Sequence, residues 1–139
     1  MSLETDRDRR YTAASVLQRI DEDTEARLQT YAAAPEAIAG RVAELDREWD
    51  IDRAVELEAA LMGLMGLGLG AFVRRGFLAA PALVGAAVFL HAVAGGYPLL
   101  PLFRRLGLRT SREIARERYA LKVLRGDFQD MQTRNERLA

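Results

Sequence analysis

The chain has 139 residues, about the length of one domain, and its twenty acidic and twenty basic side chains give a formal net charge of zero. It contains no cysteine, which excludes a disulfide framework, a thiol nucleophile and a thiolate metal site. Hydrophobic residues make up 50% of the chain, and their distribution separates an acidic arm, a long apolar stretch and a basic arm.

The acidic arm, residues 1–49, has the periodicity of helices. Apolar side chains at helical spacing predict an amphipathic helix over about residues 13–31: Val16, Leu17, Ile20, Leu28 and Tyr31. A second helix begins near Pro35, because a proline in the first helical turn lacks only an N–H group that would have no partner there. Its apolar stripe contains Ile38, Val42, Leu45 and Trp49. We expect the stripe to pack on the first helix and Trp49 to lie at a membrane interface.

The apolar stretch, residues 59–103, contains no acidic side chain and only three basic ones, Arg74, Arg75 and His91. A segment this apolar is typical of a protein in lipid, and the break at residues 74–76 is too short to carry the chain back across a bilayer. We therefore expect two helices, about residues 51–73 and 77–96, folded into a hairpin with both flanks on one side. Asp50 is the expected N-cap of the first helix.

The basic arm begins after a segment that ends the second helix, since Gly95, Gly96 and Pro98 do not favour its continuation. Thr110 and Glu113 have the spacing of a capping box, which opens a helix to about residue 125. The predicted fold is all-α: a transmembrane two-helix hairpin with amphipathic cytoplasmic helices on both sides in sequence. Its three parts are the acidic helical arm (1–49), the transmembrane hairpin (50–103) and the basic helical arm with a polar tail (104–139).

Charge distinguishes the two arms. Residues 1–58 contain fifteen acidic and eight basic side chains, a net charge of −7, whereas residues 104–125 contain eight basic and two acidic ones, a net charge of +6. The hairpin holds both arms close together, so we expect them to pack against each other. Exposed ion pairs contribute little, and apolar residues should supply the contact: Ile38, Val42 and Leu45 with Ile114, Leu121 and Leu124.

Features of residues 50–108 occur in an order shared with a protein family. The order is a charged helix start, a glycine-rich first span, an arginine turn and a second span. The second span ends in the motif Gly96-Tyr97-Pro98-Leu99-Leu100-Pro101-Leu102. A second motif follows it, Leu106-Gly107-Leu108-Arg109-Thr110. The segment resembles the YgaP-like transmembrane domain family, small helical hairpins of the bacterial inner membrane. The resemblance implies this fold and location, with Gly96, Pro98 and Gly107 as motif positions, and it implies no particular activity.

Arginines near the two ends of the hydrophobic segments outnumber those in the turn, Arg74 and Arg75. They are Arg47, Arg53, Arg104, Arg105, Arg109, Arg112, Arg116 and Arg118. By the positive-inside rule, both termini should be cytoplasmic.

One face of the first span carries a row of small residues: Ala59, Gly63, Gly66 and Gly70. They step by four, three and four residues, and such a row lets another helix approach closely. We favour a second copy of the chain as the partner, giving a homodimer. The alternative is the second span of the same hairpin, with its own small residues in the groove: Ala82, Gly85 and Ala86.

His91 is the only histidine, and it lies among apolar residues. An ionisable group in a membrane span is costly, which makes His91 a candidate intramembrane polar site. We expect a neutral imidazole hydrogen-bonded to a carbonyl group or a partner subunit; a proton-linked or ligand-contacting role is the alternative. No carboxylate or cysteine is near His91 in the sequence, so we expect no metal site and no cofactor.

No catalytic set is recognisable. The three serines lie outside any Gly-x-Ser-x-Gly elbow, and there is no phosphate-binding loop, so we do not expect an enzyme. Residues 104–125 of the basic arm contain one aromatic residue, Tyr119, and no nucleic-acid-binding module, which argues against nucleic acid as a partner. Anionic lipid or the acidic arm is the simpler partner for its positive charge.

Three functional interpretations follow. The first is a small integral membrane protein that acts as an anchor or interaction module, with the bilayer, a second copy of itself and a cytoplasmic protein as partners. The second is a small transport or ligand-binding element formed by oligomerised hairpins around His91. The third is a soluble helical oligomer that buries the hairpin between subunits.

Overall fold

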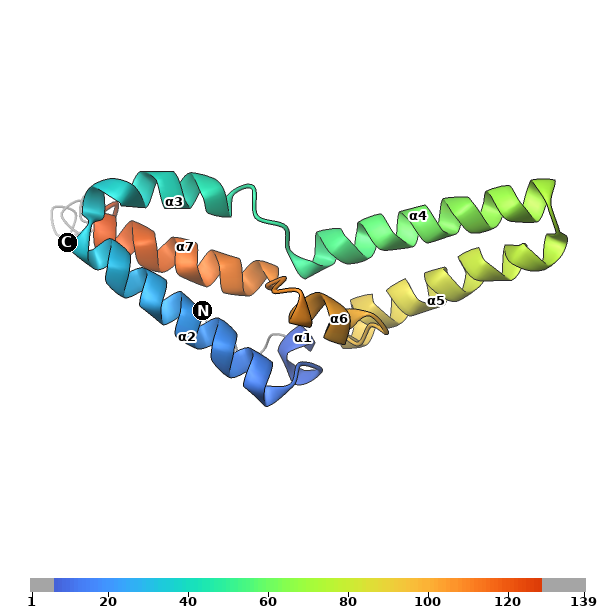
Figure 1. The fold of residues 1–139 in the computed structure, drawn as a ribbon, viewed down its shortest axis with the longest axis horizontal. Coiled ribbons are helices and arrows are strands. Elements are labelled where there is room, and N and C mark those ends of the chain that lie inside the picture. Colours follow the sequence, from blue (N-terminus) through green and yellow to red (C-terminus); the bar gives the residue numbers. More distant parts are fainter. Residues whose placement is uncertain (1–6, 129–139) are drawn as a thin grey trace, which may run out of the picture.

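The computed structural model describes residues 7–128, and helices connected by short turns make up nearly all of this part of the chain (Figure 1). The described residues form no strand beyond a single bridge between Asp50 and Arg109. The all-helical fold expected from the sequence is confirmed. Most of the predicted polar tail lies outside the described residues.

Residues 7–49 form three helices and one tight turn. α1 covers Arg7–Arg10, and α2 covers Ala14–Ala33, where the first amphipathic helix is predicted. Pro35–Ala37 form a 3-10 turn that leads directly into α3, Ile38–Leu45. The proline opens this turn as expected, because its fixed φ and missing N–H group suit a first helical turn.

Two long apolar helices follow. α4 covers Ile51–Phe72, and Asp50 caps it by accepting a hydrogen bond from the N–H of Arg53 at 2.9 Å. A 3-10 turn at Arg75–Leu78 leads into α5, Ala79–Ala94. By length and composition, α4 and the segment formed by this turn and α5 are each able to cross a membrane.

α5 ends at Gly95, which has a left-handed backbone with φ +79° and donates its N–H to the His91 carbonyl at 2.8 Å. A Cβ atom at this position would lie 2.5 Å from Cβ of Arg7 in α1. Both the backbone conformation and the close approach of α1 therefore favour glycine here.

Two more helices complete the described chain: α6 (Leu100–Arg105) and α7 (Ser111–Arg125). α7 begins with the predicted capping box. Oγ1 of Thr110 accepts from the Glu113 N–H at 3.2 Å, and the Glu113 carboxylate accepts from the Thr110 N–H at 2.9 Å. Gly126 ends the helix in the left-handed region, with φ +88°.

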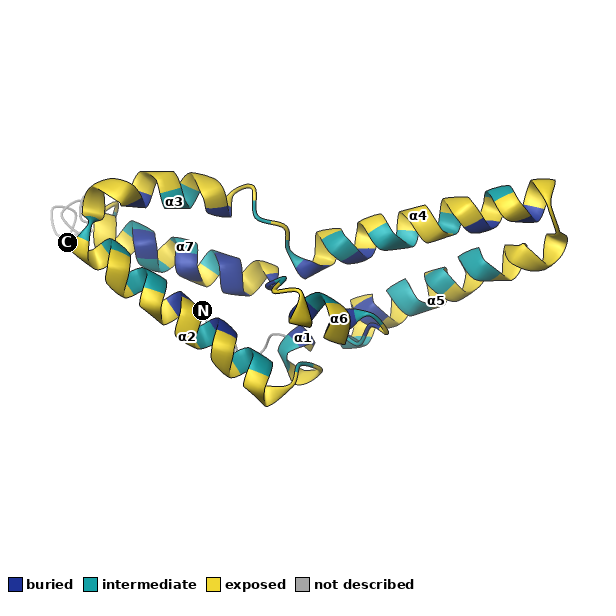
Figure 2. Cartoon of the chain, in the orientation of Figure 1, coloured by how far each residue is buried: buried dark blue, intermediate teal, exposed yellow. Residues whose placement is uncertain are grey.

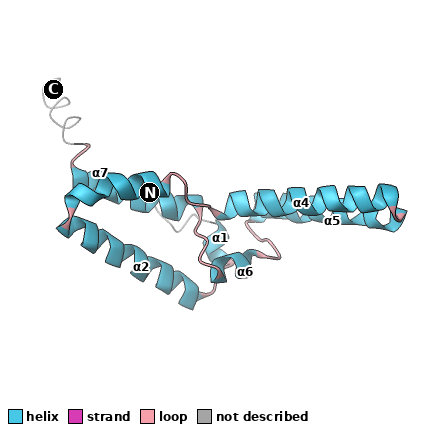
Figure 3. Ribbon diagram, turned by 45° about the horizontal axis from the view of Figure 1, so that its top comes forward, coloured by secondary structure: helices cyan, strands magenta, loops and turns pink. Residues whose placement is uncertain are grey.

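α4 and α5 lie side by side, run in opposite directions and extend away from the other helices (Figures 1 and 3). They approach most closely at two buried glycines of α4, Gly66 and Gly70. A Cβ atom at Gly66 would lie 2.7 Å from Cδ of Pro81, and one at Gly70 would lie 2.7 Å from Cγ of Leu78. The glycine pair therefore accommodates the second helix of the same chain.

This contact bears on both interpretations of the row of small residues, and it leaves the oligomeric state a prediction. In the alternative, in which the second span fills the groove, the small residues named for that span are exposed rather than in the groove: Ala82, Gly85 and Ala86. A dimer through Gly66 and Gly70 would first have to separate α4 from α5, because Pro81 and Leu78 cover that face. Gly63 takes no part in the contact, since a Cβ atom there would meet nothing within 4 Å.

α2, α3 and α7 pack together at the other end of the molecule (Figure 1). Their core contains Ile38, Leu45, Ile114 and Leu121, with Leu28, Tyr31 and Val42 packed around it. The two arms thus meet through the predicted apolar residues, with one correction. Leu124 is 46% exposed and lines an open groove between α2 and α7 rather than the core.

The helix pair leaves much apolar surface uncovered, as Figure 2 shows for the outer faces of α4 and α5. Phe72 is 92% exposed. Three more large apolar side chains are 69%, 71% and 70% exposed: Leu64, Leu83 and Phe89. Soluble monomers rarely expose apolar patches of this extent. Lipid or another protein surface must cover these faces.

Candidate functional site

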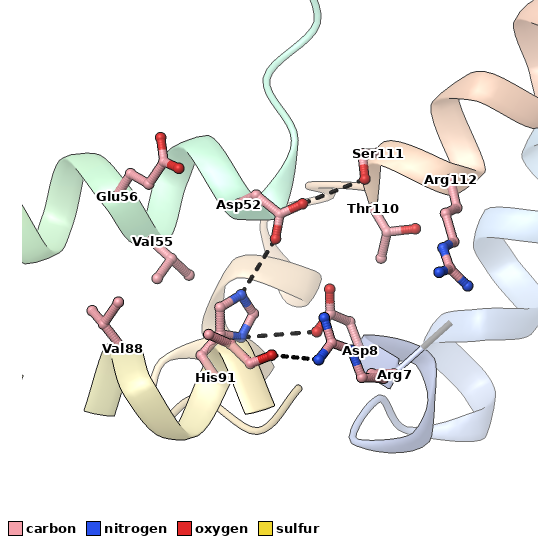
Figure 4. A pocket seen from close by; sticks show the side chains of 11 residues that line it. Arg7, Asp8, Asp52, Val55, Glu56, Val88, His91, Thr110, Ser111 and Arg112 are labelled. Carbon is pink, nitrogen blue, oxygen red and sulfur yellow. Dashed lines mark hydrogen bonds and ion pairs between the residues drawn. The ribbon is translucent and has the colours of Figure 1, made fainter. Parts of the chain in front are cut away.

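The candidate site lies where the helix pair meets α1 and the start of α7 (Figure 4). His91 belongs to the last turn of α5, and Asp52 belongs to the first turn of α4. Since the two helices run side by side in opposite directions, these two turns face each other. α1, which packs against Gly95, adds Asp8 to the same place.

The imidazole of His91 stands between two carboxylates. Its Nε2 lies 3.3 Å from Oδ1 of Asp52, and its Nδ1 lies 3.8 Å from Oδ1 of Asp8. His91 and Asp8 are buried, whereas the Asp52 side chain is 52% exposed. Nδ1 of His91 is buried and has no hydrogen-bond partner among the described residues. One donor atom from each of the three residues lies within 4.8 Å of the others, so the cluster has the nitrogen and oxygen donors of a metal site.

A cavity of about 520 Å³ opens beside this cluster. Its charged lining residues are Asp8, Asp52, Glu56, Arg7 and Arg112. Three carboxylates thus face two guanidinium groups, and with a neutral imidazole the lining carries one net negative charge. Such a cavity has room for a small polar ligand and water.

Arg7 of α1 and Ser111 of α7 donate hydrogen bonds to the helix pair at the edges of the site. The Arg7 guanidinium donates to the carbonyl oxygens of Ala92 and, at 3.3 Å, of Val93. These carbonyls belong to the C-terminal turn of α5, where carbonyl oxygens lack partners within the helix and a positive charge is favourable. The Ser111 hydroxyl donates to Oδ2 of Asp52 at 3.3 Å. α1 and α7 are therefore both attached to the end of the helix pair at which α4 begins and α5 ends.

Tyr97 packs beside the cluster on its apolar side. Its ring lies edge-on to His91, with 5.7 Å between ring centroids, and stacks on Phe103 at 6.3 Å. Its hydroxyl donates a hydrogen bond to the carboxylate of Glu58 in α4. Burial, together with the adjacent Glu58 carboxylate, raises the pKa of Tyr97 to about 12. The phenol is therefore neutral at physiological pH and supplies Glu58 with a hydrogen bond.

Two buried glutamates of α7, Glu117 and Glu113, connect the acidic and basic arms through ion pairs. Glu117 is 0% exposed and accepts hydrogen bonds from Arg27, Arg41 and Arg109, with Nε of Arg41 at 3.0 Å from Oε1. Burial alone would raise its pKa, but the hydrogen bonds from the three arginines outweigh that effect and lower the pKa to about 2. Glu117 therefore stays ionised and ties α2, α3 and the α6–α7 connection to α7.

Glu113 forms a second buried cluster, accepting from Arg104 at 2.7 and 2.9 Å and from Arg9 at 2.5 Å. Burial opposes ionisation here too, but these arginines and the Thr110 N–H lower the pKa of Glu113. Arg104 and Arg109 are 1% and 5% exposed. From the sequence, both are predicted to be among the arginines that flank the membrane. In the structure they are buried in ion pairs within the bundle.

The other predicted positions surround the site rather than forming it. Gly96 lies next to the ring of Tyr11, and Pro98 is exposed. Gly107, with φ +90°, makes the turn between α6 and α7. Ala59 and Gly63 are partly buried on α4 and contact none of the cluster.

The expectation that His91 has no carboxylate near it is wrong, since Asp8 and Asp52 both face its ring. Asp52 could be found from the sequence, because a hairpin places the first turn of one helix opposite the last turn of the other. Asp8 could not, since it precedes the periodic segments and no pattern places it. His91 is also less isolated than expected, because it lies at the polar end of the helix pair (Figure 4).

No family model, no curated protein and no solved structure matches the chain. The resemblance of residues 50–108 to the YgaP-like transmembrane domain family therefore stays a prediction from the sequence.

Proposed function

We propose that the chain is a small integral protein of the bacterial inner membrane, in which α4 and α5 cross the bilayer as a hairpin and the other helices form a cytoplasmic interaction module. The observation that carries the proposal is the uncovered apolar surface of the pair, with Phe72 92% and Leu83 71% exposed. Lipid tails can cover such faces because helices satisfy their backbone hydrogen bonds internally.

The length of the pair agrees with a span that has polar groups at both ends. The charge-free part of α4, residues 59–72, is roughly 21 Å long at 1.5 Å per residue, against a hydrocarbon core of about 30 Å. Arg74 and Arg75 can extend toward the headgroups at the turn, and local thinning of the bilayer can absorb the remaining difference. Glu58 would enter the interface paired with Tyr97. Trp49, 48% exposed just before α4, would lie in the headgroup region.

The proposed topology places both termini in the cytoplasm. With Arg104 and Arg109 in ion pairs, exposed arginines at the bundle end of the pair still outnumber Arg74 and Arg75: Arg47, Arg53, Arg105, Arg112 and Arg116. This distribution supports the positive-inside orientation.

As an interaction module, the bundle offers the open groove between α2 and α7. Its apolar lining includes Leu28, Tyr119, Val123 and Leu124. A cytoplasmic protein is the proposed partner at this groove. Self-association would use the outer face of α5, where Gly85 and Ala86 are exposed and allow another helix to come close.

Carbonate extraction of membranes from cells that make the protein tests the proposal. An integral protein stays in the membrane pellet, whereas a soluble oligomer that buries the pair between subunits is released. Ala86→Arg places a charge near the middle of the second span, at a cost of about 2.5–3.5 kcal/mol, and should lower the inserted fraction. Leu124→Arg adds the same charge to the bundle and should leave extraction unchanged. Release of the wild-type protein would contradict the proposal.

Reporter fusions test the orientation. A reporter that is active only in the periplasm should stay inactive when fused after Ala139 and become active when inserted in the turn after Gly76. The reverse pattern would place the bundle outside.

The cavity beside His91 favours a second function, a small transport or ligand-binding element formed by oligomerised hairpins. In that case the purified protein in liposomes should produce an ion flux that His91→Ala abolishes. A flux that is equal in both proteins, or absent, would exclude His91 as its carrier.

A further inference from the structure

With a neutral imidazole, only one of the two ring nitrogens of His91 can donate a hydrogen bond to a carboxylate. A neutral imidazole has one N–H donor and one nitrogen with a lone pair, while an ionised carboxylate can only accept. Both ring nitrogens of His91 face carboxylate oxygens, Asp52 at 3.3 Å and Asp8 at 3.8 Å. If one nitrogen donates a hydrogen bond, the other directs its lone pair at an acceptor. A cation between that nitrogen and its carboxylate removes the conflict.

The distances place this cation on the Asp8 side of the ring. Nε2 lies within hydrogen-bond reach of Asp52, whereas Nδ1 is buried and has no hydrogen-bond partner within residues 7–128. A separation of 3.8 Å from Nδ1 to Asp8 is too long for a hydrogen bond. Two ligand atoms that each lie about 2.1 Å from a tetrahedral metal ion are about 3.4 Å apart, so a small side-chain movement would close the site.

We propose that Nδ1 of His91 and the carboxylate of Asp8 bind a divalent transition-metal ion, with Zn²⁺ and Mn²⁺ as the ions to test. Imidazole and carboxylate together suit first-row transition metals. Water from the adjoining cavity fills the remaining coordination positions. The net negative charge of the cavity lining, three carboxylates against two arginines, favours a cation over an anion.

Asp52 is a positioning residue in this site. Metal-bound histidines commonly donate their other ring N–H to a carboxylate, which fixes the tautomer and the ring orientation. Nε2 of His91 and Oδ1 of Asp52 have this relationship, and Ser111 in turn donates to Oδ2 of Asp52 at 3.3 Å. The bound ion joins α1 to the end of α5, so binding stabilises the contact between the N-terminal arm and the helix pair. This inference does not depend on whether the pair spans a membrane.

The test uses the full chain without a histidine tag, purified in detergent and titrated calorimetrically with Zn²⁺ and, separately, with Mn²⁺. The wild type should bind one ion per chain. Asp8→Asn and His91→Gln should lose saturable binding. Asp52→Asn should keep one site per chain and bind about 10- to 100-fold more weakly, which is the usual effect of removing such a partner.

Glu56→Gln is the matched control, because Glu56 lines the same cavity and its loss removes the same charge without removing a ligand. Its affinity should equal that of the wild type. Melting temperatures of the metal-free proteins show whether each variant folds, and saturating Zn²⁺ should raise the melting temperature of the wild type and Glu56→Gln but not of Asp8→Asn. If neither ion binds saturably to the wild type, a proton rather than a metal occupies Nδ1 and the proposal is wrong. Wild-type affinity in a folded His91→Gln or Asp8→Asn would overturn it equally.

Discussion

Gly66 in α4 lies directly against Pro81 in α5, so that a Cβ atom at Gly66 would be 2.7 Å from Cδ of the proline ring and 3.0 Å from Cβ of Ala80. Neither atom belongs to a flexible side chain that could move aside. The helix pair can therefore reach its observed spacing only with glycine at this position.

Gly66→Leu should destabilise the protein by about 1–3 kcal/mol, the usual cost of overpacking, without changing its oligomeric mass. Gly63→Leu is the control, because it adds the same side chain to the same helix where a Cβ atom meets nothing within 4 Å. Thermal unfolding and light scattering in detergent measure both quantities. A fall in oligomeric mass for Gly66→Leu, with stability unchanged, would instead support the dimer face predicted from the row of small residues.

Glu117→Gln should lower the free energy of unfolding by about 3–5 kcal/mol, because it leaves the three arginines around it, one of them buried, without their shared carboxylate. Arg109 is the most affected, since it is 5% exposed. Glu44→Gln removes a glutamate that pairs with Arg41 at 3.0 Å but whose side chain is 65% exposed, and it should cost about 0–1 kcal/mol. Denaturant unfolding followed by circular dichroism gives both values, and equal effects would show that burial of the ion pairs is unimportant.

Acid should weaken the bundle through the same carboxylate. The pKa of Glu117 falls from 4.5 to about 2 on folding, so the unfolded chain binds a proton at higher pH than the folded chain does. The resulting stability is fully present above pH 4.5 and is lost as the pH falls toward 2. A shift of this size corresponds to about 3 kcal/mol. Unfolding free energies measured across this window should decline less in Glu117→Gln than in the wild type, and parallel curves would contradict the assignment.

Tyr97 should ionise later than an exposed tyrosine when the pH is raised. Its pKa of about 12 reflects burial and the neighbouring Glu58 carboxylate. The phenolate absorbance that disappears in Tyr97→Phe should therefore be centred near pH 12. The control is Tyr119→Phe, which removes a ring that is 62% exposed and should leave the absorbance change near pH 12 in place. A Tyr97 titration near 10 would show that its hydroxyl is not held by Glu58.

The helices could be read from the sequence because each depends on local chemistry. Asp50, and Thr110 with Glu113, begin their helices as predicted, since capping needs only residues within one turn of each other. The contact between the arms followed from apolar periodicity, as Ile38 and Leu121 show.

The spacing of the glycines does not determine whether the helix that packs against them belongs to the same chain or to another. Gly66 and Gly70 predict a close approach, but only the packed structure shows that Pro81 and Leu78 supply it and that Gly85 faces outward. The rotation of α5 about its own axis decides this, and α5 is apolar on all sides, so its sequence marks no preferred face.

The polar contacts depended on tertiary structure most of all. Arg104 and Arg109 look like membrane-flanking charges in sequence, yet the turn at Gly107 folds them back onto Glu113 and Glu117 of α7. Asp8 reaches His91 across 83 positions of sequence because α1 packs on the end of α5. Composition and periodicity determined the helices and their apolar faces, because those depend on neighbours within a few residues. The partners of the charged groups were decided only when distant segments met, because burial makes an unpaired charge too costly and leaves one arrangement that satisfies them together.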